Sequence, residues 1–94
     1  MAANTDGFLK ALPDQEARKW YEGCEKKAYA LKGGVGVVDE WKIEVPHRNI
    51  IGMLERPRRL SEVVESASML EEKAGLRLKK LLLFGVEMGF IEEK

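Results

Sequence analysis

Apolar residues between positions 13 and 32 recur at the spacing of an amphipathic α-helix, with charged residues between them. Pro13 suits the first position of a helix, and Gly33-Gly34 is a strong stop signal. The pattern predicts one helix over 13–32, preceded by a flexible tail and lead-in over 1–12. The apolar stripe of this helix consists of Ala17, Trp20, Tyr21, Cys24, Ala28 and Leu31.

The hydrophobic period changes after Gly34. Trp41, Ile43 and Val45 alternate with charged residues, and alternation over five positions is typical of a half-buried strand. Asp39-Glu40 is a candidate turn, although neither residue prefers the positive φ that the tightest hairpins require. The sequence therefore predicts a short β element, a strand or a hairpin, over 35–45, and it does not identify a partner strand.

Three further helices are predicted between Pro46 and Gly89. The first opens at Pro46 and closes before Pro57, because proline suits a first turn but interrupts a helix interior. Ser61 is a good N-cap for the second helix, and the third begins near residues 74–75. The buried faces consist of Ile50, Ile51 and Leu54 in the first helix, Val63, Val64, Ala67 and Leu70 in the second, and Leu78, Leu81, Leu82, Val86 and Met88 in the third.

Composition places these elements in one domain of 94 residues, with 16 basic and 16 acidic side chains and a formal net charge of zero. A neutral total argues against a protein that coats nucleic acid through bulk charge, although a local basic face is compatible with it. Glu supplies 13 of the 16 acids, and only three residues are Asn or Gln. This bias resembles the composition of heat-adapted proteins.

The sequence has few residues that could form a catalytic or metal-binding site. One cysteine, Cys24, excludes an internal disulfide, and His47 is predicted to be a surface or capping residue without a catalytic partner. We expect no metal, no cofactor and no enzymatic activity. The first residues do not resemble a signal peptide, and the longest apolar run, 81–86, is far shorter than the ~20 residues that span a bilayer. The expectation is a soluble cytoplasmic protein.

Two strings in the second half resemble a known family. Ile50-Ile51-Gly52-Met53-Leu54-Glu55-Arg56-Pro57-Arg58-Arg59-Leu60-Ser61-Glu62-Val63-Val64 is similar to the opening of a winged helix-turn-helix regulator domain, where a proline break is followed by leucine and a capped helix. Leu81-Leu82-Leu83-Phe84-Gly85-Val86-Glu87-Met88-Gly89-Phe90-Ile91-Glu92-Glu93 resembles the end of the recognition helix and its exit into the wing. The resemblance covers 46–94 and implies a mostly α, winged-helix-like fold.

The sequence departs from the family pattern in two places. Leu60 and Gly89 are 29 residues apart, so the turn between the last two helices must be longer than usual. Only five residues follow Gly89, too few for a two-stranded wing. Either the wing is truncated or its second strand comes from elsewhere in the chain, with 41–45 as the candidate.

The resemblance implies that the helix before Gly89 lies in the major groove of double-stranded DNA, with its N-terminal half at the base edges. That half carries Arg77, Lys79 and Lys80, and leucines between them give the helix one basic and one apolar face. Arg58 and Arg59 would hold the phosphate backbone. The prediction is a small transcriptional regulator that binds double-stranded DNA as a homodimer.

Two alternatives remain open. A basic cluster on an amphipathic helix is often only a solvated face, and helix-turn-helix units also serve as protein-interaction modules within larger complexes, without DNA binding. The stripe of the first predicted helix can pack on the remaining helices or contact a dimer mate or another partner, and we expect part of it to pack and the remainder to form a dimer. The candidate contact residues are Trp20, Tyr21, Cys24, Ala28 and Leu31.

Overall fold

A computed structural model describes residues 5–33, 36–39, 41, 45–68 and 72–94 and shows a mostly helical fold with a small three-stranded antiparallel sheet. In chain order the elements are α1 (Thr5–Ala11), α2 (Asp14–Cys24), β1 (Ala28–Leu31), α3 (Gly36–Asp39), α4 (Val45–Ile51), the 3-10 helix η1 (Gly52–Glu55), β2 (Arg58–Arg59), α5 (Leu60–Ser68), α6 (Glu72–Glu87) and β3 (Ile91–Glu93).

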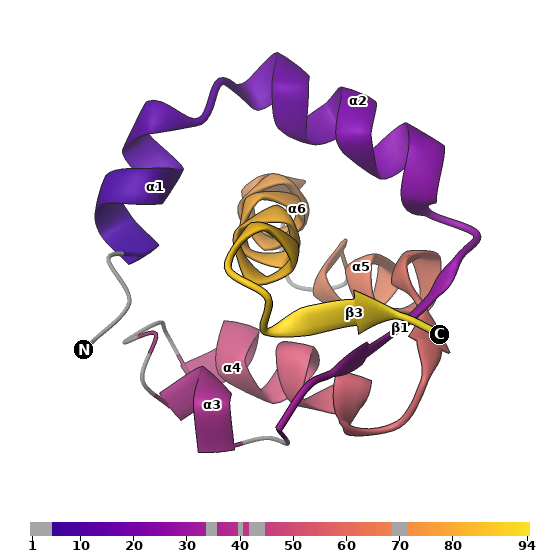
Figure 1. The fold of residues 1–94 in the computed structure, drawn as a ribbon. Helices are drawn as coiled ribbons and strands as arrows, with labels where there is room; N and C mark the ends of the chain where they lie inside the picture. The colour runs from indigo at the N-terminus through magenta and orange to yellow at the C-terminus, as the bar shows by residue number, and fades with distance from the viewer. Residues whose placement is uncertain (1–4, 34–35, 40, 42–44, 69–71) are drawn as a thin grey trace.

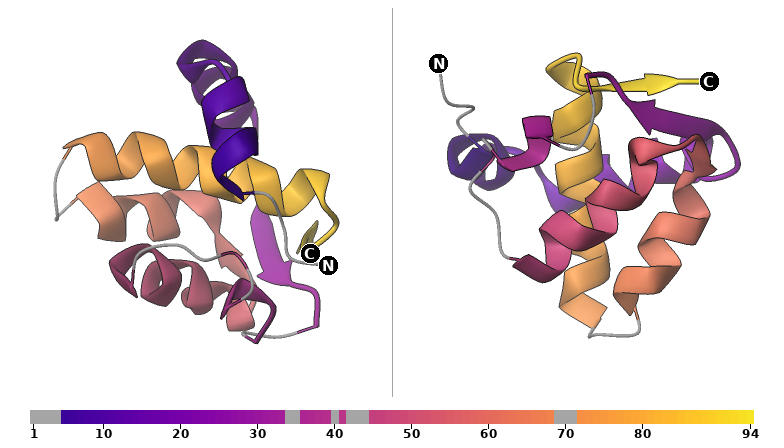
Figure 2. Two further views of the ribbon diagram at one scale, coloured as in Figure 1. Left: turned by 90° about the vertical axis from the view of Figure 1, so that its left-hand side faces the viewer. Right: turned by 90° about the horizontal axis from the view of Figure 1, so that it is seen from below.

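Helix α6 is the centre of the molecule. Figure 1 shows α6 almost end-on, beneath the arch that α1 and α2 form, and Figure 2 shows it between that arch and the pair α4 and α5. Leu78, Leu81 and Leu82 are fully buried, and Leu83 and Phe84 are buried on other sides of the helix. A helix that is apolar around most of its circumference is expected to be enclosed by neighbours.

The first third of the chain differs from the prediction. The predicted helix over 13–32 ends at Cys24, and residues 28–31 form strand β1 instead. The sequence reads Ala28-Tyr29-Ala30-Leu31, whose last three residues are all buried, so this strand is covered on both faces and shows no alternation. Residues 1–12 are not simply a flexible tail, because α1 occupies Thr5–Ala11 and Leu9 lies in the core.

The sheet has the order β2-β1-β3, so β1 is its central strand. Ala28 pairs with Arg59 on one side, and Leu31 pairs with Ile91 on the other. The predicted β element over 35–45 is wrong where the structure describes it, since Gly36–Asp39 is helical, Trp41 lies in a turn and Val45 begins α4. Residues 35, 40 and 42–44 lie outside the described residues.

The second half agrees with the predicted series of helices. The first is α4 continued by η1 and ends before Pro57, the second is α5, and the third is α6. Gly89 has a φ of 80°, a left-handed conformation that favours glycine and turns the chain out of α6 into β3. The third helix is predicted to begin near residues 74–75, and α6 already includes Glu72.

An aromatic group closes the core where the N-terminal arch meets α6. Trp41 and Phe84 pack edge to face with ring centroids 5.3 Å apart, and Phe8 packs against Phe84 at the same distance. Phe90 lies 5.8 Å from Trp41 on the exit from α6. Such contacts contribute about 0.5–1.5 kcal/mol each beyond their buried area. The arch is therefore an integral part of the core.

Candidate functional site

The five residues predicted to contact DNA lie on two elements with different surroundings. Arg77, Lys79 and Lys80 are on α6 and are all partly buried, whereas Arg58 and Arg59 form β2 and are exposed. Whether the cations on α6 can reach a nucleic acid depends on what packs against that helix.

Lys80 is held by the first residue of α2. Its Nζ lies 2.5 Å from Asp14 Oδ1, and the Lys80 side chain is only 16% exposed. The hydrogen bond from Lys80, followed by its positive charge, lowers the pKa of the Asp14 carboxyl below its usual value. Asp14 also suits a helix N-terminus, where the backbone dipole favours an acid.

Lys79 makes a second contact with α2. Its Nζ lies 4.6 Å from the centroid of the Tyr21 ring, a distance at which a cation is attracted to the face of an aromatic ring. Tyr21 is buried, and its burial, with smaller contributions from the Glu25 and Glu65 charges, raises the pKa of its phenol. Both predicted lysines are thus engaged inside the molecule.

These contacts lie on the face of α6 that points toward α2. Successive residues of an α-helix are about 100° apart, so positions 76, 79, 80 and 83 share one side and positions 78, 81, 82 and 85 share the other. On the first side, Leu83 is only 8% exposed. A second helix on this side fills the space that the walls of a major groove need, because the groove is only about 12 Å wide.

The prediction that α6 has one apolar and one basic face is therefore wrong. Apolar residues lie on both sides of the helix, and on the outer side Leu83 is buried beside the two lysines. Sequence reasoning missed Asp14 and Tyr21 as partners of these lysines. Leu76 and Leu83 are the signal in the sequence, because both fall on the side of the helix that carries the two lysines.

The predicted partner-contact stripe is mostly inside the molecule. Tyr21 and Leu31 are each only 7% exposed, and Trp20 and Cys24 are partly buried against the core. Ala28 and Leu31 lie on β1 and do not belong to the same helix as the other three residues. Packing within the chain accounts for the buried part of this stripe, and the prediction that one helix carries all five residues is wrong.

A different set of cations is on the surface. Arg56, Arg58 and Arg59, which we call the arginine edge, are all exposed, and the last two form the edge strand β2. Arg58 Nε donates a hydrogen bond to the Met53 carbonyl oxygen at 3.0 Å. Within the described part of the chain, none of the three arginines lies within ion-pair distance of a carboxylate.

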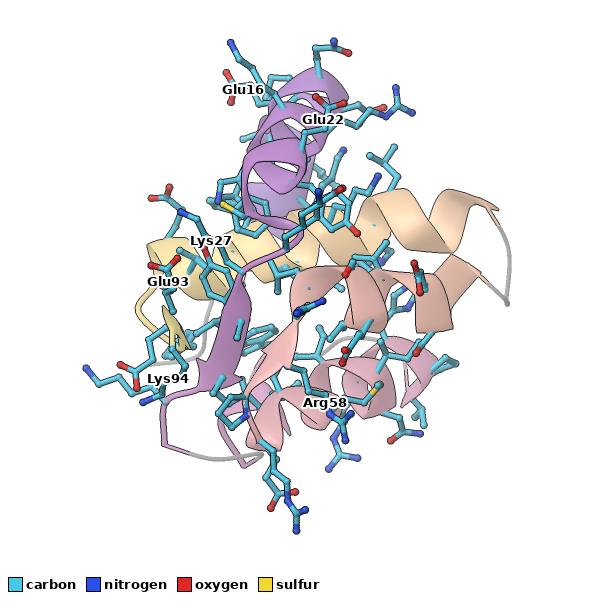
Figure 3. All side chains as sticks on the ribbon, turned by 90° about the vertical axis from the view of Figure 1, so that its right-hand side faces the viewer. Glu16, Glu22, Lys27, Arg58, Glu93 and Lys94 are labelled. Carbon is cyan, nitrogen blue, oxygen red and sulfur yellow. The ribbon has the colours of Figure 1, made fainter. Side chains whose placement is uncertain are left out.

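The opposite edge of the sheet carries both signs of charge, and these charges are paired with each other. Lys27 Nζ lies 3.4 Å from Glu93 Oε1, and Lys94 Nζ lies 2.6 Å from Glu92 Oε1. The hydrogen bond from Lys94, with its charge, lowers the pKa of the Glu92 carboxyl. Figure 3 shows Lys27 beside Glu93, with Arg58 on the other side of β1. The two edges of one small sheet therefore differ in charge.

The buried polar groups do not form a catalytic arrangement among the residues described. Burial, and then a hydrogen bond with Cys24, raises the pKa of the Tyr29 phenol far above its usual value. His47 is not the surface residue that the sequence suggests, because both of its ring nitrogens are buried. Trp41 Nε1 is also buried, and it has no hydrogen-bond partner in the described ranges.

No protein-family model, curated protein or solved structure matches this chain. In the described ranges, no helix combines the length and the apolar character needed to cross a bilayer. Across the same residues, no three His, Cys, Asp or Glu side chains are grouped in a way that would hold a metal ion.

Proposed function

We propose that this chain is a winged-helix-like module that binds a protein partner and does not read DNA with α6. The order α4, β2, α5, α6, β3 supports the winged-helix description. So does the position of β1, which pairs with β3 as the second strand of a wing would. The wing strand that the second half lacks would then be supplied by the N-terminal third of the chain.

The observation that carries the proposal is the position of α2 over the outer face of α6. Lys80 contacts Asp14, Lys79 contacts Tyr21, and Leu83 on the same side of α6 is buried. A reading helix must present a free face to the base edges. Placing α6 in a groove would require the removal of α2, and that would break both lysine contacts.

The charge distribution supports the same conclusion. The formal net charge is zero, and lysines near β3 are paired with Glu92 and Glu93. DNA-binding domains usually gather a clear excess of Lys and Arg on one face, because each phosphate contact releases counterions. A surface of mixed sign is more typical of a protein that recognises another protein.

A titration with duplex DNA at two salt concentrations tests the proposal. We expect weak binding at low salt, with no contribution from Lys79 or Lys80. Replacing both lysines by Ala should lower the free energy of unfolding, because they stabilise the packing of α2, and should leave DNA affinity unchanged. Lys19→Ala is the matched control, since Lys19 is an exposed lysine on α2. Tight binding whose salt dependence becomes shallower when Lys79 and Lys80 are removed would refute the proposal.

Double-stranded DNA, bound by a homodimeric regulator, is the second candidate function. It is favoured by the exposure of Arg58 and Arg59, the two residues assigned to the phosphate backbone. In this case DNA affinity in the same titration would fall in an Arg58→Ala, Arg59→Ala variant. Sedimentation of the complex would then give two chains per duplex.

A further inference from the structure

Resting on the proposed function, we infer that the arginine edge is the docking site for an extended acidic segment of a partner protein, which adds to β2 as a further strand. Residues 55–59 are exposed without interruption, so this edge of the sheet is open. Arg56 has extended backbone angles, φ −115° and ψ 151°, and β2 follows directly after Pro57. The chain is therefore already in the conformation that a neighbouring strand requires.

The hydrogen bonds of β1 show which backbone groups of β2 face outward. Leu60 N–H donates to the Lys27 carbonyl at 3.3 Å, and Lys94 N–H donates to the Ala28 carbonyl at 2.8 Å. Ala28 therefore directs its backbone groups toward β3. In an antiparallel ladder, two residues that lie opposite each other either bond to each other through both backbone groups or direct both groups away from each other. Because the backbone groups of Ala28 point away from β2, those of the residue opposite it point away from β1. Arg59 is that residue, so its N–H points to the open edge.

The carbonyl group of Pro57 also points to the open edge of the sheet. Backbone direction alternates along a strand, so the carbonyl of Pro57 points to the same side as the N–H of Arg59. An acceptor and a donor two residues apart on one edge can bind a single residue of an added strand. Main-chain pairing of this kind supplies affinity in strand addition, while side chains supply specificity.

Charge specifies the partner. Arginine binds carboxylates through two parallel hydrogen bonds, and the arginine edge has no carboxylate within ion-pair distance in the described part of the chain. Alternation places Arg56 and Arg58 on one face of the strand and Arg59 on the other. An added strand with acids on both faces would therefore reach all three guanidinium groups.

The same residues disfavour other occupants. Proline and like charges on an edge strand oppose pairing between identical edges, so two copies of β2 repel each other. Exposed Glu55 and Glu62 flank the arginine edge. A DNA-binding surface commonly contacts six to ten phosphates, whereas this edge offers three arginines between acids. Three arginines are enough to bind a short acidic peptide segment, but they are too few for the phosphates of a duplex.

Fluorescence anisotropy of the full chain with a labelled peptide of about eight residues that repeats Glu-Glu-Val-Val, and so carries acids on both faces of a strand, tests the inference. We expect saturable binding that weakens about tenfold or more in Arg58→Glu and in Arg59→Glu. Arg58→Glu also removes the bond to Met53, so Arg59→Glu is the cleaner variant. Lys19→Glu, at an exposed position on α2, is the matched control and should bind as the wild type does. The backbone amide resonance of Arg59 should shift on binding.

Three outcomes would overturn the inference. The first is equal affinity of the acidic peptide for the wild type and for Arg59→Glu. The second is preferential binding of a duplex that requires Arg58 and Arg59, which would assign the edge to nucleic acid. The third is concentration-dependent self-association that the same substitutions abolish, which would assign it to a second copy. The proposed function fails separately, through DNA affinity that depends on Lys79 and Lys80.

Discussion

Gly85 is required by the close approach of two core residues to α6. A Cβ added at this position would lie 2.8 Å from Ile91 Cγ1 and 2.9 Å from Trp41 Cη2. Both distances are shorter than ordinary contacts between carbon atoms, which are about 3.5–4.0 Å. The missing side chain is thus what lets β3 and the indole of Trp41 pack directly on the helix.

Gly85→Ala is expected to destabilise the protein by about 1–3 kcal/mol, since overpacking outweighs the gain of up to about 1 kcal/mol in helix propensity. The free energy of unfolding in urea measures this change. Gly23→Ala is the matched control, because a Cβ there meets no atom within 4 Å. That variant should be as stable as the wild type or slightly more so. Equal stabilities of the two variants would show that the contacts at Gly85 are absent.

Both tyrosines of the chain, Tyr21 and Tyr29, should lose their phenol protons only at a pH above the usual pKa of tyrosine. Burial is the main cause that raises the pKa of each phenol above the usual 10. Because the folded pKa is raised, the neutral phenols stabilise the fold fully below pH 10, and this contribution is lost as the pH rises through the folded pKa values. Absorbance of tyrosinate against pH should therefore rise only above pH 10 and together with unfolding. Tyrosinate formation near pH 10 in the folded protein would contradict the burial of both rings.

At the scale of elements, α6 is the helix on which α1, α2, α4 and α5 pack. Its leucines and lysines form two buried sides, one against the helices that follow β1 and one against α2. Leu83 distinguishes this arrangement from a DNA-reading helix. On a helix that faced solvent or a groove, its side chain would contribute little to folding.

Leu83→Ala should cost about 2–5 kcal/mol, the range for a buried leucine, because the shorter side chain would leave a cavity beside α6. Thermal and denaturant unfolding both measure the loss. Met88→Ala is the comparison, since Met88 is 52% exposed near the end of the same helix and should cost less than about 1 kcal/mol. A similarly small effect at Leu83 would mean that α2 does not cover α6 in solution.

The sequence predicts the second half of the fold well, because its signals are local. Pro57 ends one helix, Gly89 ends another, and the apolar spacing between them is helical throughout. The first third is predicted poorly because its structure depends on distant residues. Ala28 and Leu31 continue the helical spacing of Tyr21 and Cys24, yet pairing with β2 and β3 makes them a strand. Tertiary contacts override local pattern in such short segments.

The candidate site was predictable only in part. The exposed arginines follow from Pro57 and the charges beside it, since an edge strand commonly carries both. The burial of Lys79 and Lys80 could not be predicted, because it depends on where α2 lies after the chain has turned at residues 25–27. The pattern of charges alone does not show whether a charged face of a helix stays in solvent or is covered by another helix.

At the scale of the molecule, residues 46–94 should not fold as an independent unit. Without β1 the two remaining strands have no common neighbour, and without α2 the outer side of α6 is exposed. A fragment of these residues is expected to lack a cooperative thermal transition by circular dichroism, whereas the full chain shows one. A fragment that unfolds cooperatively near the melting temperature of the full chain would contradict this.

The central place of β1 also affects how the native state is reached. Its two partners lie roughly 30 and 60 residues further along the chain, so both ladders need long loops to close. Helical segments form from neighbouring residues and are expected to appear first in refolding. The ladders would follow as the rate-limiting event, and mutations in β1 would then slow refolding more than they speed unfolding.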